Sequence, residues 1–75
     1  MDKIAEIIEL FGVISNNIDI NHIQNMIIIR RDMEYTTVFT GTEPLRVVAF
    51  NNIEMTAETL ITILKRRADR VLNPN

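Results

Sequence analysis

Four consecutive apolar residues, Met26 to Ile29, are followed directly by three charged residues, Arg30 to Asp32. A run this short and this rich in β-branched Ile favours a β-strand over a helix. Successive side chains of a strand point to opposite faces, so this strand is apolar on both faces. Strands of this kind are usually covered on both sides, by helices or by another chain. This block therefore limits the fold to a sheet that needs a cover on each face.

The residues after the charged block predict two more strands. From Met33 to Thr40 the chain alternates β-forming side chains, with Met33, Tyr35, Thr37 and Phe39 on one face. Arg31 and Asp32 then form a tight turn, so that the charges lie at the tip of a hairpin. A second turn, Gly41 to Pro44, leads to a third strand over Leu45 to Phe50.

A helix is predicted from Asp2 to Ser15. Its apolar residues recur at the three-and-four spacing of one helix face, and they are Ile4, Ile7, Ile8, Phe11 and Ile14. Asp2 is a suitable N-cap, and its charge and that of Glu6 favour the positive end of the helix dipole. Gly12 and the Ser-Asn-Asn sequence after Ile14 indicate a weakened end and a turn.

A second helix is predicted after the turn "NNIEM". Thr56 is a suitable N-cap, and Glu58 lies in the first turn, where a negative charge is favourable. Its apolar face is predicted to consist of Ala57, Leu60, Ile61, Leu64, Ala68, Val71 and Leu72. Cations gather near its C-terminal end, the favourable end for positive charge, and Lys65 is spaced to pair with Asp69.

The segment between the first helix and the first strand permits two interpretations. Ile18, Ile20 and His22 alternate with Asp19 and Asn21, as in a short strand, but the flanking Asn residues equally favour a loop. We assign it as a connector. The predicted fold is a single α+β domain over residues 1–75, in the order α-β-β-β-α. Its three-stranded antiparallel meander is packed by the N- and C-terminal amphipathic helices.

The arrangement of the helices stays open at this point. One helix on each sheet face would give a compact monomer. Two helices on one face would leave the other for a second chain, and an exposed sheet edge would do the same. A core from fewer than about 80 residues rarely supplies more than about 3–5 kcal/mol, and the chain has no cysteine for disulfides or thiolate zinc sites. We therefore expect a homo-oligomer, most simply a dimer.

No residue pattern predicts catalysis. Gly12 and Gly41 stand alone rather than in a phosphate-binding loop, and Ser15 and His22 have no third residue that would orient them. A single histidine cannot form a metal site by itself. We expect no catalytic, cofactor-binding or metal site, no cofactor and no small-molecule substrate.

Charge is unevenly distributed along the chain, although the net charge is only −2. Residues 1–43 contain three basic and seven acidic residues, and residues 44–75 contain five basic and three acidic ones. The candidate interaction surface combines basic residues of the hairpin and the second helix with two aromatic residues: Arg30, Arg31, Tyr35, Phe39, Lys65, Arg66, Arg67 and Arg70. A solvated basic helix end explains the cations without any partner. Of the two binding interpretations, contact with another protein is preferred, and nucleic-acid binding through the basic residues is the alternative.

The start of the chain carries acids inside its apolar run, so it does not resemble an export signal, and no apolar run is long enough for a membrane span. We expect a cytoplasmic protein without a membrane partner. Many Ile and Asn residues are typical of A+T-rich coding sequences, including those of many phages. The functional expectation is a small non-enzymatic protein, a regulatory or inhibitory accessory encoded by a phage or mobile element, that binds a larger and unidentified protein.

Overall fold

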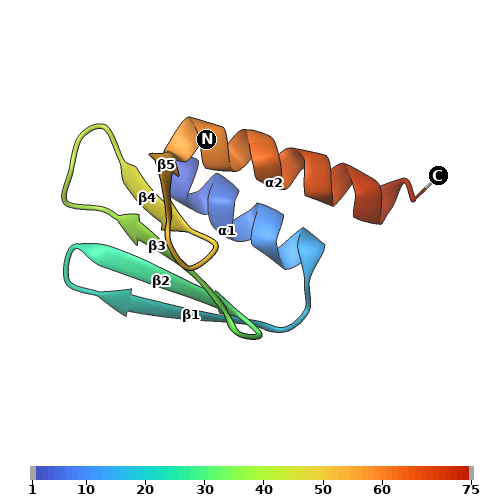
Figure 1. Cartoon of the computed structure of the whole chain (residues 1–75), viewed down its shortest axis with the longest axis horizontal. Helices are drawn as coiled ribbons and strands as arrows, with labels where there is room; N and C mark the ends of the chain where they lie inside the picture. The colour runs from blue at the N-terminus through green and yellow to red at the C-terminus, as the bar shows by residue number, and fades with distance from the viewer. Residues whose placement is uncertain (1, 75) are drawn as a thin grey trace.

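The computed structural model describes residues 2–74, which form two helices and one five-stranded antiparallel sheet (Figure 1). The sheet order is β1-β2-β3-β4-β5, so every strand pairs with its neighbours in sequence. In chain order the elements are α1 (Lys3–Ile14), β1 (Ile18–Ile23), β2 (Met26–Arg31), β3 (Glu34–Phe39), β4 (Arg46–Ala49), β5 (Ile53–Thr56) and α2 (Ala57–Leu72). The predicted α+β class and the antiparallel meander between terminal helices are confirmed.

Both helices begin at the predicted caps. The Asp2 carboxylate accepts a hydrogen bond from the Ile4 backbone N–H at 3.0 Å, and the Thr56 hydroxyl accepts one from the Thr59 N–H at 3.1 Å. These bonds satisfy N–H groups that have no partner inside the helix. Gly12 does not end α1, which continues to Ile14.

The three predicted strands are the central ones, β2, β3 and β4. Arg31 pairs with Glu34, so the turn between β2 and β3 consists of Asp32 and Met33, one residue later than predicted. Asp32 has a φ of 54°, in the left-handed region that Asp tolerates better than most residues. The hairpin itself is confirmed, but only Asp32 of the charged block lies at its tip, because Arg30 and Arg31 are the last two residues of β2.

The connector assignment for the segment before β2 was wrong. Ile18–Ile23 is strand β1, and it pairs with β2 over its whole length, from Ile18 opposite Arg31 to Ile23 opposite Met26. A two-residue turn, Gln24 and Asn25, joins the two strands, and Asn25 has a φ of 64°. Of the flanking Asn residues, Asn25 lies in this turn and Asn16 and Asn17 lie between α1 and β1. The alternation between them is that of an edge strand.

The segment before the second helix is also a strand rather than only a turn. Ile53–Thr56 forms β5, which pairs with β4 across a loop of three residues, Phe50 to Asn52. Asn51 holds this loop against β3, because its N–H donates to the Tyr35 carbonyl and its Oδ1 accepts from the Tyr35 N–H, each at 2.8 Å. The sheet therefore has two more strands than predicted, one at each edge.

Both helices pack on the same face of the sheet (Figure 1), which resolves the arrangement that the sequence left open. The core combines side chains of both helices with those of one sheet face, and its members are Ile7, Phe11, Ile27, Ile29, Val38, Val47, Ala49, Ala57, Leu60, Ile61 and Leu64. The predicted apolar face of α2 is confirmed as far as Ala68. Val71 and Leu72 are 51% and 66% exposed, because the last turn of α2 does not pack on the core.

Candidate interaction surface

The sheet face that points away from the helices is the principal candidate surface, and we call it the open face. In β2, Ile27 and Ile29 are buried under the helices, so their neighbours Met26, Ile28 and Arg30 point to the opposite side. The same alternation and the strand register place on the open face Asp19, Asn21, Ile23, Met26, Ile28, Arg30, Tyr35, Thr37, Phe39, Arg46, Val48, Glu54 and Thr56.

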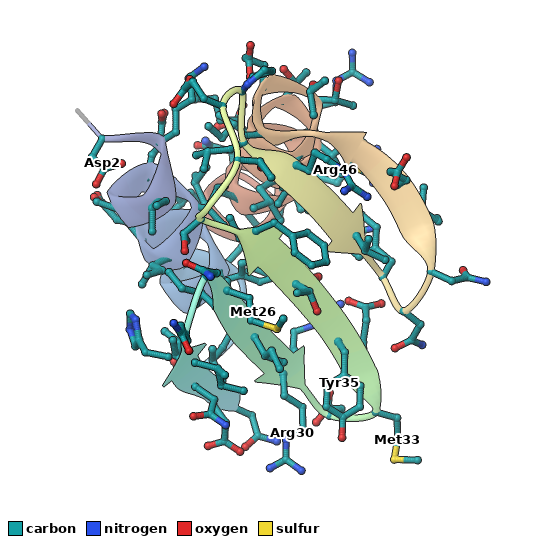
Figure 2. The ribbon with its side chains drawn as sticks, turned by 90° about the vertical axis from the view of Figure 1, so that its left-hand side faces the viewer. Asp2, Met26, Arg30, Met33, Tyr35 and Arg46 are labelled. Atoms are coloured by element: carbon teal, nitrogen blue, oxygen red, sulfur yellow. The ribbon has the colours of Figure 1, made fainter. Side chains whose placement is uncertain are left out.

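The centre of the open face is apolar. Ile23 is 46% and Tyr35 is 47% exposed, and Met26, Ile28, Phe39 and Val48 are partly buried without belonging to the side chains that pack on the core. Figure 2 labels Arg46 and Met26 toward one end of the strands and Tyr35 and Arg30 toward the other. An antiparallel sheet usually presents polar side chains on its uncovered face. Here the charged side chains lie only around the margin, and Thr37 is a polar residue among the apolar side chains of the centre.

Two ion pairs occupy the margin. Arg30 and Asp19 pair between β2 and β1, and Arg46 Nη2 lies 2.7 Å from Glu54 Oε2 between β4 and β5. The hydrogen bond to Asp19 and its negative charge raise the pKa of Arg30. The Arg46 guanidinium also lies over the Phe39 ring, 5.2 Å from the ring centre, as in a cation–π contact.

The open face contains three of the eight predicted surface residues, Arg30, Tyr35 and Phe39. Arg31 points to the side of Ile29, and its guanidinium lies 3.3 Å from the Glu34 carboxylate. The hairpin cations are therefore on opposite faces of β2, because adjacent strand residues alternate.

The basic end of α2 provides the other predicted residues. Lys65 Nζ lies 3.4 Å from the Glu6 carboxylate of α1. It therefore forms an ion pair between the two helices, whereas the sequence predicted a pair with Asp69. The Arg67 guanidinium stacks on the Phe50 ring, 4.3 Å from its centre. Arg66 and Arg70 are exposed and have no ion-pair partner among residues 2–74. Four of the six predicted cations thus contact other side chains of this chain.

Sequence reasoning missed the remaining apolar side chains of the open face and three charged residues at its margin, Asp19, Arg46 and Glu54. The Asp19 and Glu54 positions depend on β1 and β5, which were not predicted as strands. The alternation of apolar and acidic residues in both segments, "IDI" and "IEM", was the available signal.

A shallow depression of about 380 Å³ adjoins the open face beside the turn between β2 and β3. Its lining residues are Asn17, Asp19, Arg30, Asp32 and Met33. The Asn17 side-chain amide donates to the Asp32 carboxylate at 2.9 Å. Met33 is 87% exposed at the rim, which extends apolar surface beyond the sheet.

The other residues considered from sequence lie apart from the open face. His22 is an exposed residue of β1 on the helix-facing side, and Ser15 is the C-cap of α1. Within residues 2–74, no group of three His, Cys, Asp or Glu residues is placed to hold a metal ion. No helix in this part of the chain is long and apolar enough to cross a membrane.

Comparison of the chain with known protein families, curated proteins and solved structures finds no match.

Proposed function

We propose that this chain is a small non-enzymatic interaction domain that binds a larger protein through the open face, as a regulatory or inhibitory accessory. The observation that supports the proposal is the one-sided cover of the sheet. Two helices pack on one face, while Met26, Ile28, Phe39 and Val48 are left on the other without a partner in the core. Contiguous exposed apolar surface with a polar margin is typical of protein-binding sites.

The residue types of the open face agree with this use. Interface centres are enriched in aromatic residues, Met and Arg, and are surrounded by a polar rim. The open face places Phe39, Tyr35 and Met26 beside Arg30 and Arg46. Both arginines are held in ion pairs, so their side chains are partly ordered before a partner binds.

Recovery of a bound protein by an affinity-tagged chain tests the proposal. The informative variant is Thr37→Lys, because Thr37 lies in the middle of the open face between Ile28 and Val48. Thr62→Lys is the matched control, since it adds the same charge at an exposed position of α2. The wild-type chain and the control are expected to recover the same protein from host extract, and Thr37→Lys to lose it. Equal recovery by Thr37→Lys would refute the open face as the binding surface.

A second variant tests whether the basic end of α2 is the contact instead. Arg66→Glu/Arg70→Glu reverses the two exposed cations that have no ion-pair partner in the described chain. This variant is expected to recover the protein as well as the wild type does. Its failure, together with normal recovery by Thr37→Lys, would move the contact to α2.

A further inference from the structure

Strand β1 is an edge of the sheet, and half of its backbone groups point away from the molecule. The turn between β1 and β2 has only two residues, so the pair that closes it, Ile23 and Met26, exchanges its backbone hydrogen bonds. Hydrogen-bonded and non-hydrogen-bonded pairs alternate along an antiparallel ladder. The residues whose N–H and C=O groups point outward are therefore Ile18, Ile20 and His22. No other group within residues 2–74 forms a hydrogen bond with these outward groups.

This edge lacks the features that usually protect an exposed strand from pairing with another chain. Such features are Pro, Lys, a bulge or a very short strand. β1 has six residues, none of them Pro or Lys, and it pairs with β2 residue by residue without a bulge. Five of the six are exposed, and β1 lies at the lower margin of the molecule in Figure 1. The opposite edge, β5, has four residues and continues directly into α2.

We propose that β1 pairs antiparallel with β1 of a second copy of this chain, in a two-fold symmetric dimer. The five strands of each copy then form one continuous sheet. The two-fold axis is perpendicular to that sheet, so all four helices lie on one side and the two open faces join on the other. The short β5 strands become the edges of the dimer, so pairing stops at two copies. The proposal concerns a different surface from the proposed function and does not depend on it.

The outward backbone groups select one register. When Ile20 lies opposite Ile20 of the second copy, Ile18 lies opposite His22, and every outward N–H and C=O group of both strands is paired, in six hydrogen bonds. A shift by two residues in one direction places Asp19 opposite Asp19, where like charges are unfavourable. The opposite shift places Ile18 beside Gln24, which belongs to the turn. The register centred on Ile20 is therefore the one that satisfies the whole edge.

The side chains agree with this register. On the open face Asp19 lies opposite Asn21 of the second copy, whose amide donates to the carboxylate while the carboxylate keeps its ion pair with Arg30. On the helix-facing side Ile20, which is 38% exposed, meets its own copy at the axis. The two-fold axis repeats the contact between Asp19 and Asn21, and no like charges meet. This agreement favours a second copy over an unrelated extended segment, which would share only the backbone hydrogen bonds.

Sedimentation equilibrium measures the association. Two paired strands of six residues bury less surface than a standard interface and bind mainly through backbone hydrogen bonds, so a weak dimer is expected. Samples from about 10 µM to about 1 mM cover the dissociation constants of weak complexes. The apparent mass should rise with concentration from 8.7 kDa toward twice that value. A mass that stays at 8.7 kDa over the whole range would overturn the proposal.

Ile20→Pro tests the role of the edge. It removes an N–H group that donates to the second copy but faces solvent in the monomer, where an edge strand tolerates Pro. The two-fold axis doubles the loss to two of the six hydrogen bonds, so association should weaken by at least about tenfold. Ile20→Val keeps the N–H group and should associate as the wild type does. Unchanged association of Ile20→Pro would overturn the proposal.

Disulfide formation tests the register and does not depend on the stability of the Pro variant. The chain has no cysteine of its own. Asp19 and Asn21 of the second copy would have Cα atoms about 4.5 Å apart, within reach of a disulfide. The two copies of either residue would be about 8 Å apart, which is too far.

A mixture of Asp19→Cys and Asn21→Cys chains should therefore form disulfide-linked dimers faster than either chain does alone. Thr62→Cys, at an exposed position of α2, gives the rate of random collision. Equal rates for the mixture and for Thr62→Cys would overturn the proposal. Faster linkage of one edge variant with itself would exclude this register.

The proposal and the proposed function fail separately. Thr37 lies in β3, away from the β1 edge, so Thr37→Lys should leave the self-association unchanged. Ile20→Pro should likewise leave the recovery of a bound protein unchanged. A chain that stays monomeric, but loses its recovered protein on Ile20→Pro substitution, would assign the edge to an extended segment of that protein and exclude the second copy.

Discussion

Ile28 and Ile29 are adjacent in β2 and chemically identical, but they lie on opposite faces of the sheet. The loss of stability on substitution of each by Ala therefore measures how well each face is covered. Ile29 is 1% exposed beneath the helices, whereas Ile28 is partly exposed on the open face and does not pack on the core. Removal of a buried Ile side chain to Ala costs about 2–5 kcal/mol, so we expect about 3 kcal/mol for Ile29→Ala.

Ile28→Ala should cost only about 1 kcal/mol in the monomer, since its side chain removes less apolar surface from water and leaves no enclosed cavity. Both variants replace Ile by Ala in the same strand, so the loss of strand propensity is similar in the two and largely cancels when their stabilities are compared. A core of this size supplies about 3–5 kcal/mol, so Ile28→Ala should stay folded and Ile29→Ala should be folded only marginally in the absence of urea.

Urea unfolding of a dilute sample, at about 1 µM, measures the two costs in the monomer. With a slope of about 1 kcal/mol per molar urea, a difference of about 2 kcal/mol separates the two midpoints by about 2 M. Equal midpoints for Ile28→Ala and Ile29→Ala would refute the one-sided cover of the sheet, because two covered faces would lose similar contacts.

Three further predictions concern local features. Gly12→Ala should stabilise the chain by about 0.5–1 kcal/mol in thermal unfolding, because an added Cβ meets no atom within 4 Å and Gly is costly inside a helix; a lower melting temperature would contradict this. Asn51→Ala should cost about 1–2 kcal/mol, since it removes the acceptor for the Tyr35 N–H and places Ala at a φ of 77°. Asn51→Gly should cost less, and equal losses would assign the whole effect to the hydrogen bond. The pKa of the Glu58 carboxyl is lowered by a hydrogen bond from the Glu58 backbone N–H and by the Lys3 ammonium. The stabilising effect of the ionised carboxylate is therefore present above the ordinary pKa of the group and is lost as pH falls through the lowered pKa. Glu58→Gln should therefore lose less stability on acidification than the wild type, and identical acid unfolding curves would contradict this.

The parts of the fold that were predictable from sequence are those in which one chain segment carries its own signal. The three-and-four spacing of α1, the N-caps Asp2 and Thr56, and the alternation around Tyr35 each depend on local chemistry, and the structure has all of them. The last turn of α2 has the same spacing, but periodicity does not tell whether another element is present to cover Val71 and Leu72.

The edge strands were harder to predict because their signals are weak and ambiguous. β1 has a single neighbour in the sheet, and the turn that joins it to β2 lacks the Asn-Gly or Asp-Gly pair that would have marked a hairpin. β5 has only four residues, and its last residue, Thr56, is also the N-cap of α2. A helix start was therefore readable there, but a strand was not.

The candidate surface was also predictable only where a single segment carries its own signal. Tyr35, Phe39 and Arg30 could be chosen from residue type and alternation, but the side of the sheet that the helices leave uncovered depends on how both ends of the chain fold back. The pairs Asp19–Arg30 and Arg46–Glu54 join residues 11 and 8 positions apart through the strand pairing, so they became visible only with the register.

The central claim is that the helices cover only one face of the sheet and leave the open face accessible to solvent. Attenuation of Ile methyl NMR signals by a soluble gadolinium chelate tests this claim directly. The signals of Ile28 and Ile23 should be attenuated, while those of Ile27 and Ile29 should be protected. Equal protection of Ile28 and Ile29 would contradict the claim.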